Sequence, residues 1–216
     1  MKKNYLILFT FLLSIFAVNA QELRPYVGLG GFVHLYSFEK DLQSSPAVSL
    51  SAGAEYKLFG FFLPEIEANY MFGKFKNKPN LNANVNTSDK TFSNVNFSFA
   101  PKISLSNYGE SAYFQIFPKY IYSLISATET ISTSSQLGTG TKERSTSISQ
   151  HNYGIGFGVV FNFDTWYSNS LAMNLSYSSV RVSHAFDKLN PGTERTDNNG
   201  VYGIELKYYF GVKRLK

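Results

Sequence analysis

The sequence predicts an all-β chain in which eight antiparallel strands form an up-and-down transmembrane β-barrel. Three observations favour this fold. Segments of alternating polarity recur along the chain, each close to the roughly ten-residue length of a tilted membrane strand. Aromatic residues make up 17% of the chain, which is typical of strands. The connections alternate between short and long, as a barrel with short turns at one end requires.

Each expected strand has one apolar parity and one polar or small parity. In VSLSAGAEYKLF (48–59), for example, Val48 and Leu50 alternate with Ser49 and Ser51. No segment has a helical period, so we expect no helix in the mature chain. The expected strands cover residues 26–38, 47–59, 64–75, 94–105, 112–124, 149–163, 171–180 and 201–210.

The connections between these strands fall into two length classes. Residues 60–63, 106–111 and 164–170 form short connections. Residues 39–46, 74–91, 125–147 and 183–200 form longer ones, rich in Asn, Ser, Thr and Gly. In outer-membrane barrels the short turns face the periplasm and the longer loops face outward. We therefore expect periplasmic turns and extracellular loops.

The first twenty residues have the pattern of a signal peptide. Lys2 and Lys3 precede an apolar run over residues 5–18, which is too short to span a bilayer. Val18-Asn19-Ala20 supplies a small-residue cleavage pattern, so we expect cleavage between Ala20 and Gln21. The predicted organisation is a signal peptide at 1–20, a barrel at 21–212 and a basic tail at 213–216.

Composition narrows the classes of function. The chain has no cysteine, so an exported barrel must be stable without disulfides, and a lipid-anchored lipoprotein is excluded. Loss of Lys2 and Lys3 reduces the formal net charge from +5 to +3. This charge is too small to indicate a nucleic-acid partner.

The charged residues of the strands predict which face points outward. Eight of them share the polar parity, four acidic and four basic. A charge facing lipid at the bilayer midplane costs roughly 2–4 kcal/mol, whereas a paired charge can be accommodated inside. We therefore expect the apolar parity to face lipid and a charge network to line the interior: Glu55, Lys57, Glu65, Glu67, Lys102, Lys119, Glu205 and Lys207.

Aromatic residues gather near both sets of connections, which predicts two interfacial girdles. The girdle beside the short turns comprises Tyr56, Phe59, Phe61, Phe62, Tyr108, Tyr113, Phe163, Trp166, Tyr167, Tyr208 and Phe210. The girdle beside the long loops comprises Tyr36, Phe38, Phe72, Phe75, Tyr122, Tyr153 and Tyr202.

Several segments resemble the small outer-membrane barrels of the OmpA/OmpX kind, and most of all the PorT-like outer membrane protein beta-barrel domain family of Bacteroidota. The similarity covers the cleavage pattern, YVGLGGF (26–32), SFAPKISL (98–105), YGIGFGVVFNF (153–163) and GIELKYYF (203–210). The last strand also resembles the C-terminal signal read by the outer-membrane insertion machinery, carried here by Gly203, Leu206, Tyr208 and Phe210. We expect a monomer in the outer membrane that contacts membrane lipids and lipopolysaccharide.

Catalytic, metal and cofactor sites are not expected. Ser149 and His151 place a hydroxyl and an imidazole on one strand face, as a nucleophile and its base require, but on the lipid-facing parity. Asp187, Glu194 and Asp197 do not have EF-hand spacing. The alternating glycines of YGIGFG lack the strand–turn–helix context of a nucleotide site. The Lys74–Lys78 stretch is a basic patch that suits either lipopolysaccharide phosphates or a solvated loop.

The sequence therefore predicts an integral outer-membrane barrel with a filled interior and a structural or surface-interaction role through its loops. Two alternatives remain open at this point: a narrow transport conduit or PorT-like accessory of protein secretion, and a membrane-embedded lipid hydrolase.

Overall fold

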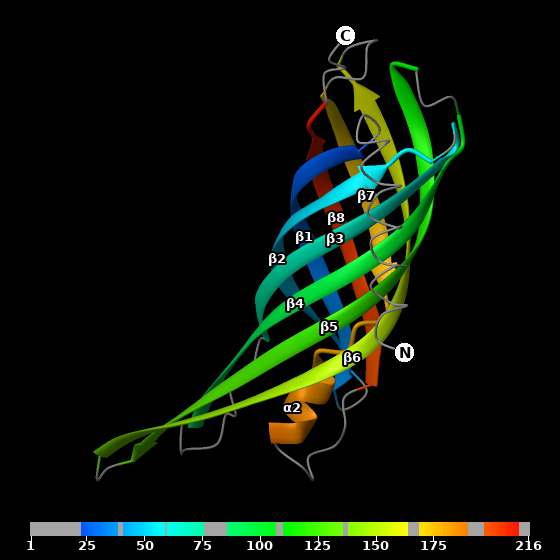
Figure 1. Ribbon diagram of the computed structural model, residues 1–216. Coiled ribbons are helices and arrows are strands. Elements are labelled where there is room, and N and C mark those ends of the chain that lie inside the picture. The colour runs from blue at the N-terminus through cyan, green and yellow to red at the C-terminus, as the bar shows by residue number, and fades with distance from the viewer. Residues whose placement is uncertain are drawn as a thin grey trace, which may run out of the picture.

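The computed structural model describes residues 23–38, 41–58, 60–75, 86–106, 110–135, 138–163, 169–189 and 197–211. Eight strands follow one another in a closed barrel, each antiparallel to its neighbours, and β1 pairs with β8 to complete it (Figure 1). The predicted fold class is confirmed. The strands are β1 (Leu23–Phe38), β2 (Asp41–Tyr56), β3 (Phe62–Phe75), β4 (Asn86–Ser104), β5 (Ala112–Ser135), β6 (Gly138–Asn162), β7 (Ser170–Ser178) and β8 (Asp197–Tyr209).

The two ends of the barrel differ. The short connections after β2, β4 and β6 lie at one end, at the top of Figure 1, together with the end of β8. We call this the turn end and the opposite one the loop end. The predicted signal peptide, its cleavage site at Ala20 and Gln21, and the basic tail at 213–216 lie outside the described residues.

Three of the predicted long loops are shorter than predicted. β4 begins at Asn86, so only residues 76–85 separate it from β3, not the loop predicted at 74–91. β1 and β2 remain paired as far as Phe38 and Asp41, so only two residues separate them, not a loop over 39–46. β5 and β6 remain paired as far as Ser135 and Gly138, through most of the loop predicted at 125–147. The ladder bonds are made by the backbone, and Thr and Ile favour strands whether or not they are buried. The predicted loop boundaries were therefore wrong because they were drawn from polar composition alone.

As a result, a sheet projects beyond the barrel. β4, β5 and β6 are paired past the last residues of β3 and β7, and the β5–β6 hairpin extends furthest, at the lower left of Figure 1.

A short helix, α2 (Ser183–Leu189), corrects the prediction of an all-loop connection between β7 and β8. Its Ala185 is fully buried, as is Val182 just before it. A helix of seven residues has too few turns to establish a 3.6-residue period in the sequence, so only its packing partners stabilise it.

The wall of the barrel separates apolar from polar side chains. On every strand an outward-facing large apolar residue is about half exposed, whereas the opposite parity is buried in the lumen. On β5 this outward band runs from Phe114 to Leu124, eleven residues, which matches the span of a tilted membrane strand. One outward residue from each strand, in order, is Leu29, Leu50, Ile66, Phe97, Phe114, Ile155, Leu175 and Leu206.

Candidate functional site: the charged lumen

The lumen brings together most of the charged residues predicted to line it. Glu55, Glu65, Glu67, Lys102, Glu205 and Lys207 are buried, and the side chain of Lys119 is only 10% exposed. They come from five strands, β2, β3, β4, β5 and β8, and each has the parity opposite to the outward apolar band. The alternation of the strands therefore places them together, although Glu55 and Lys207 are about 150 residues apart in the sequence.

Lys57 differs from the other seven. β2 ends at Tyr56, and Lys57 is only half-buried just beyond it, at the turn end. Parity predicts the direction of a side chain only while the extended backbone continues. The predicted interior position therefore does not apply to a residue past the end of its strand.

Arg24 takes part in the network, and the sequence analysis missed it. β1 begins at Leu23, three residues before the predicted start, and this puts Arg24 on the inward parity. Its Nη2 lies 2.7 Å from Glu55 Oε1 and its Nη1 donates to Ser170 Oγ at 3.1 Å. With Arg24 in place of Lys57, the buried set still has four acidic and four basic residues.

These eight residues form one continuous series of opposite charges along the lumen. From the turn end inward the order is Arg24, Glu55, Lys102, Glu65, Lys207, Glu67, Lys119 and Glu205. Glu55 Oε2 lies 3.2 Å from Lys102 Nζ, which also pairs with Glu65. Lys207 Nζ lies 2.8 Å from Glu65 Oε1 and also pairs with Glu67. Glu67 Oε1 lies 3.1 Å from Lys119 Nζ, and Glu205 ends the series at 4.0 Å from Lys119.

Two buried tyrosines bridge the series. Tyr209 donates a hydrogen bond to Glu65 at 3.0 Å and accepts one from Lys102 at 2.6 Å. Tyr26 donates to Glu67 at 2.9 Å. Buried charges are tolerated when they are both paired and hydrogen-bonded, and these hydroxyls supply the second condition. Tyr113, which the sequence analysis placed in the outer girdle, is also fully buried and accepts from Arg24.

An amide and hydroxyl network lies beyond the charges, toward the loop end. Asn152 Nδ2 donates to Ser123 Oγ at 3.0 Å, and Ser123 Oγ donates to Asn96 Oδ1 at 2.7 Å. Asn96 Nδ2 in turn lies 3.4 Å from Asn69 Oδ1. These contacts connect the inner faces of β3, β4, β5 and β6, so the network ties four neighbouring strands together.

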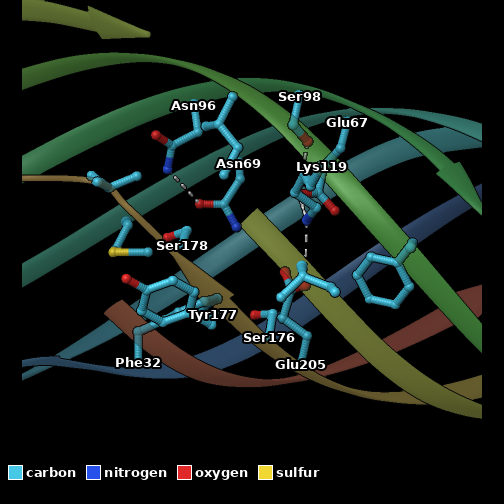
Figure 2. Close-up of a pocket in the computed structure, with 15 residues that line it drawn as sticks. Phe32, Glu67, Asn69, Asn96, Ser98, Lys119, Ser176, Tyr177, Ser178 and Glu205 are labelled. Atoms are coloured by element: carbon cyan, nitrogen blue, oxygen red, sulfur yellow. Dashed lines mark hydrogen bonds and ion pairs between the residues drawn. The ribbon is translucent and has the colours of Figure 1, made fainter. Parts of the chain in front are cut away.

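A small cavity with a mixed polar and apolar lining lies between the two networks, shown in Figure 2. Its volume is about 40 Å³, and since one water needs roughly 10–15 Å³ on this measure, it has room for about three waters. Glu205 borders it, and its Oε1 is buried with no hydrogen-bond partner among the described groups. The cavity exists because the β6–β7 wall presents only small inward residues here, including Ser176 and Ser178.

Gly156 on the same wall shows why small residues are needed. A Cβ at this position would overlap the ring of Phe117, which projects into the lumen from β5. Glycine therefore lets the wall approach a crowded interior, as expected for a strand glycine beside a bulky neighbour.

An apolar layer closes the loop end of the lumen. Val180, Val182 and Ala185, from the segment that includes α2, pack against inward residues of the barrel such as Phe32 and Phe92. The rings of Phe75 and Phe186 meet at 5.0 Å between centroids, so Phe75 belongs to this layer and not to the predicted outer girdle. In this arrangement α2 and the residues just before it cover the loop end of the lumen with apolar side chains.

His34 is part of the same layer. It is buried, its Nε2 lies 3.4 Å from Met71 Sδ, and its ring packs edge-on against Phe92 at 4.9 Å. These neighbours are apolar or weakly polar, and the contacts are those of a packed core residue.

Ser149 and His151, the pair considered for a hydrolase, lie on the outer surface of β6. His151 Nδ1 lies 2.5 Å from the hydroxyl of Tyr120, and Tyr122 and Tyr153 are nearby. The imidazole is thus part of an aromatic cluster at the loop-side edge of the apolar band, a position suited to an interfacial girdle.

The predicted insertion-signal residues are divided between the two faces of β8. Leu206 and Phe210 face outward and Tyr208 shares their parity, whereas Gly203 faces inward against the ring of Phe32. Their recognition by the insertion machinery stays a prediction.

Within the described ranges no three His, Cys, Asp or Glu residues are grouped so as to hold a metal ion. Among the same residues, none of the helices has the length and apolar character needed to cross a bilayer.

Comparison with known proteins gave structural similarities only. No protein-family model matches the sequence, and no curated protein matches it. Similar solved structures include a neisserial surface protein, NspA (11% identity over 87% of this chain and 97% of that one, TM-score 0.45), and the attachment invasion locus protein Ail of Yersinia pestis (10%, 88% and 98%, TM-score 0.45). A major outer membrane protein from Thermus thermophilus is 8% identical over 86% of this chain and 98% of that one, with a TM-score of 0.47.

The class that the fold and lumen define is a closed eight-stranded antiparallel β-barrel with an apolar outer surface and a filled, polar interior. This assignment depends on the strand pairing and burial of the chain itself.

Proposed function

We propose that the protein is an integral outer-membrane β-barrel with a closed lumen and a structural or surface-interaction role. The observation that carries this proposal is the outward apolar band, about eleven residues long on β5, because the charged strand residues within its extent face the interior. In water such a surface would be an extensive exposed apolar patch, which soluble monomers rarely have. In a bilayer it is the expected lipid contact.

The proposal includes several features that the sequence predicts. Residues 1–20 direct export and are removed between Ala20 and Gln21, and the folded barrel is a monomer in contact with outer-membrane lipids and lipopolysaccharide. The insertion machinery reads the last strand during assembly. The relationship to PorT-like proteins of Bacteroidota belongs to the same proposal, as does the absence of catalysis.

A closed lumen is supported by two successive obstructions. The ion-pair series and its tyrosines fill the turn-side half, and the apolar layer under α2 fills the loop-side mouth. The cavity between them has room for about three waters, much less than a permeating solute requires. This arrangement favours a structural barrel over the conduit alternative.

Two measurements on the full chain test the proposal. Expressed in a Gram-negative host, the protein should fractionate with the outer membrane, begin at Gln21, and migrate differently on gels before and after boiling. The matched control is Ala20→Arg, which should leave the signal attached. Recovery of the wild type as a soluble species would contradict the membrane assignment.

The second measurement is conductance after reconstitution in a planar bilayer. A closed lumen should give no ohmic steps. A steady open channel from the folded barrel would instead favour the transport alternative.

A further inference from the structure

Beyond the apolar band, the outward face of β4, β5 and β6 consists of hydroxyl groups where the projecting sheet begins. Beyond the apolar band the strand register aligns three residues in each row, one from each strand. Two successive rows contain only serine and threonine. We call these six residues the hydroxyl face: Ser93, Ser126 and Ser147 in the first row, and Thr91, Thr128 and Ser145 in the second.

The hydroxyl face is specific to one side of the sheet and does not simply follow from a Ser- and Thr-rich composition. The opposite parity of the same segments carries Phe92, Ala127 and Ile148, together with Lys90, Glu129 and Arg144, and Thr146 is its one hydroxyl residue within these rows. Hydroxyl groups are therefore segregated to the outer side in the way that apolar residues are segregated in an amphipathic strand.

The face is open and regular. Ser126, Ser145 and Ser147 are exposed, and Ser126 Oγ lies 3.0 Å from Ser147 Oγ. Adjacent strands are about 4.8 Å apart and successive rows about 7 Å apart. Each hydroxyl can both donate and accept a hydrogen bond, so the face offers a two-dimensional array of paired donors and acceptors.

The chemistry of the face favours sugars over phosphates. No Lys or Arg occurs among the described outward residues of β4, β5 and β6 beyond the apolar band, and the next row contains Asp89, Thr130 and Glu143. Lys74 at the end of β3 lies opposite Thr91 and adds a cation only at the edge of the face. Phosphate recognition relies on cationic donors, whereas saccharide hydroxyls can exchange hydrogen bonds with neutral hydroxyls and carboxylates.

The position of the face identifies the source of the sugar. It directly continues the lipid-facing band, since the adjoining row consists of Val95, Leu124 and Ser149 and the row after that of Phe97, Tyr122 and His151. An outward-facing surface that lies one or two residue rows beyond the hydrocarbon core of the bilayer is level with the head groups of the surrounding lipids. An outer-leaflet glycolipid presents its saccharide at that height.

We propose that the hydroxyl face binds the saccharide of the glycolipid that surrounds the barrel in the outer leaflet. This inference rests on the proposed membrane-spanning function. The face acts as a lateral contact that fixes the projecting sheet in the sugar layer. Because each net hydrogen bond is worth only a modest free energy, several contacts over one flat array are needed for a measurable effect.

The test compares the wild type with a variant that lacks four of the hydroxyls, Ser126→Ala/Thr128→Val/Ser145→Ala/Ser147→Ala. Each protein is folded into liposomes containing either lipopolysaccharide with its core saccharide or lipid A alone. The quantity measured is the half-time for loss of the fast-migrating folded species at elevated temperature. The matched control is Thr146→Val on the opposite side of the sheet, and folding in detergent provides a stability reference for all variants.

We expect the wild type and Thr146→Val to persist about threefold to tenfold longer with the core saccharide than with lipid A, because each of the several sugar contacts largely replaces a hydrogen bond with water. The fourfold variant should persist equally long in both membranes. Equal half-times for the wild type in both membranes, or an unchanged ratio in the fourfold variant, would overturn the inference.

Two other outcomes would also decide against it. Equal protection by free core oligosaccharide added to lipid A membranes would point to a soluble saccharide and overturn the assignment to a membrane glycolipid. Failure of the wild type to form an inserted, heat-modifiable species in either membrane would overturn the proposed function itself, and this inference with it.

Discussion

Lys207 on β8 and Glu65 on β3 meet across the lumen, with 2.8 Å between Nζ and Oε1. The two strands are not neighbours in the barrel, so this ion pair joins opposite parts of the wall. Lys207 also pairs with Glu67 and lies 3.8 Å from Glu205. One buried ammonium group thus contacts three carboxylates in a space that is almost entirely shielded from solvent.

Replacing Lys207 by methionine should destabilise the folded barrel by about 3–5 kcal/mol, because it leaves buried carboxylates without their principal counter-charge. Urea unfolding of the protein in detergent micelles or liposomes measures the loss. The control is Lys142→Met on the exposed projecting sheet, expected to change stability by less than about 0.5 kcal/mol. Similar losses in both variants would show that the buried series is not stabilising.

Ile155→Arg should impair membrane insertion, at a cost of about 2–4 kcal/mol if the residue lies at the bilayer midplane. Ser145→Arg serves as the control, because it has the same outward parity on β6 but lies beyond the apolar band. The yield of heat-modifiable protein in the membrane fraction reports insertion. Equal yields from both variants would contradict the assignment of the band to lipid.

Gly156→Ala should destabilise the barrel by about 1–3 kcal/mol through overpacking, because the new methyl group would overlap the Phe117 ring. The double variant Gly156→Ala/Phe117→Leu should recover part of this loss by making room in the lumen. Gly31→Ala is the matched control, since a Cβ there meets open space. Thermal unfolding of the three variants tests the prediction, and no recovery in the double variant would count against the contact.

Val182→Asp should release α2 from the mouth of the barrel, because it places a charge in the apolar layer where Val182 is fully buried. The strands should remain folded, so heat-modifiable migration should persist while proteolysis near residues 183–189 accelerates. His184→Asp, at an exposed position of the same helix, should leave proteolysis unchanged. Equal cleavage of both variants would show that the apolar layer does not hold the helix.

Much of the barrel follows from strand parity, and Glu65 and Glu67 illustrate why. Each lies within a regular alternating strand, so its direction was predictable from neighbours two residues away. Lys57 and Arg24 show the limit of this reasoning. Their directions depend on whether β2 ends before residue 57 and whether β1 begins before residue 24, and strand ends are decided by pairing with other strands.

The loop end was predicted less well for a related reason. Residues 125–147 are polar on one face, so the sequence resembles a loop, yet pairing of β5 with β4 and β6 satisfies their backbone groups and extends the sheet. The helix α2, in contrast, depends on side-chain contacts with residues outside its own segment. Its seven residues have little intrinsic helical stability, and contact with the apolar mouth of the lumen stabilises it.

By itself, the amino-acid order determined that strands of alternating character would close into a barrel with charges inside, because a two-residue period is a local property. Only the tertiary structure decided which charges meet, how far the sheet projects and what closes the mouth. Those features depend on contacts between strands distant in sequence, and no local pattern encodes such distances.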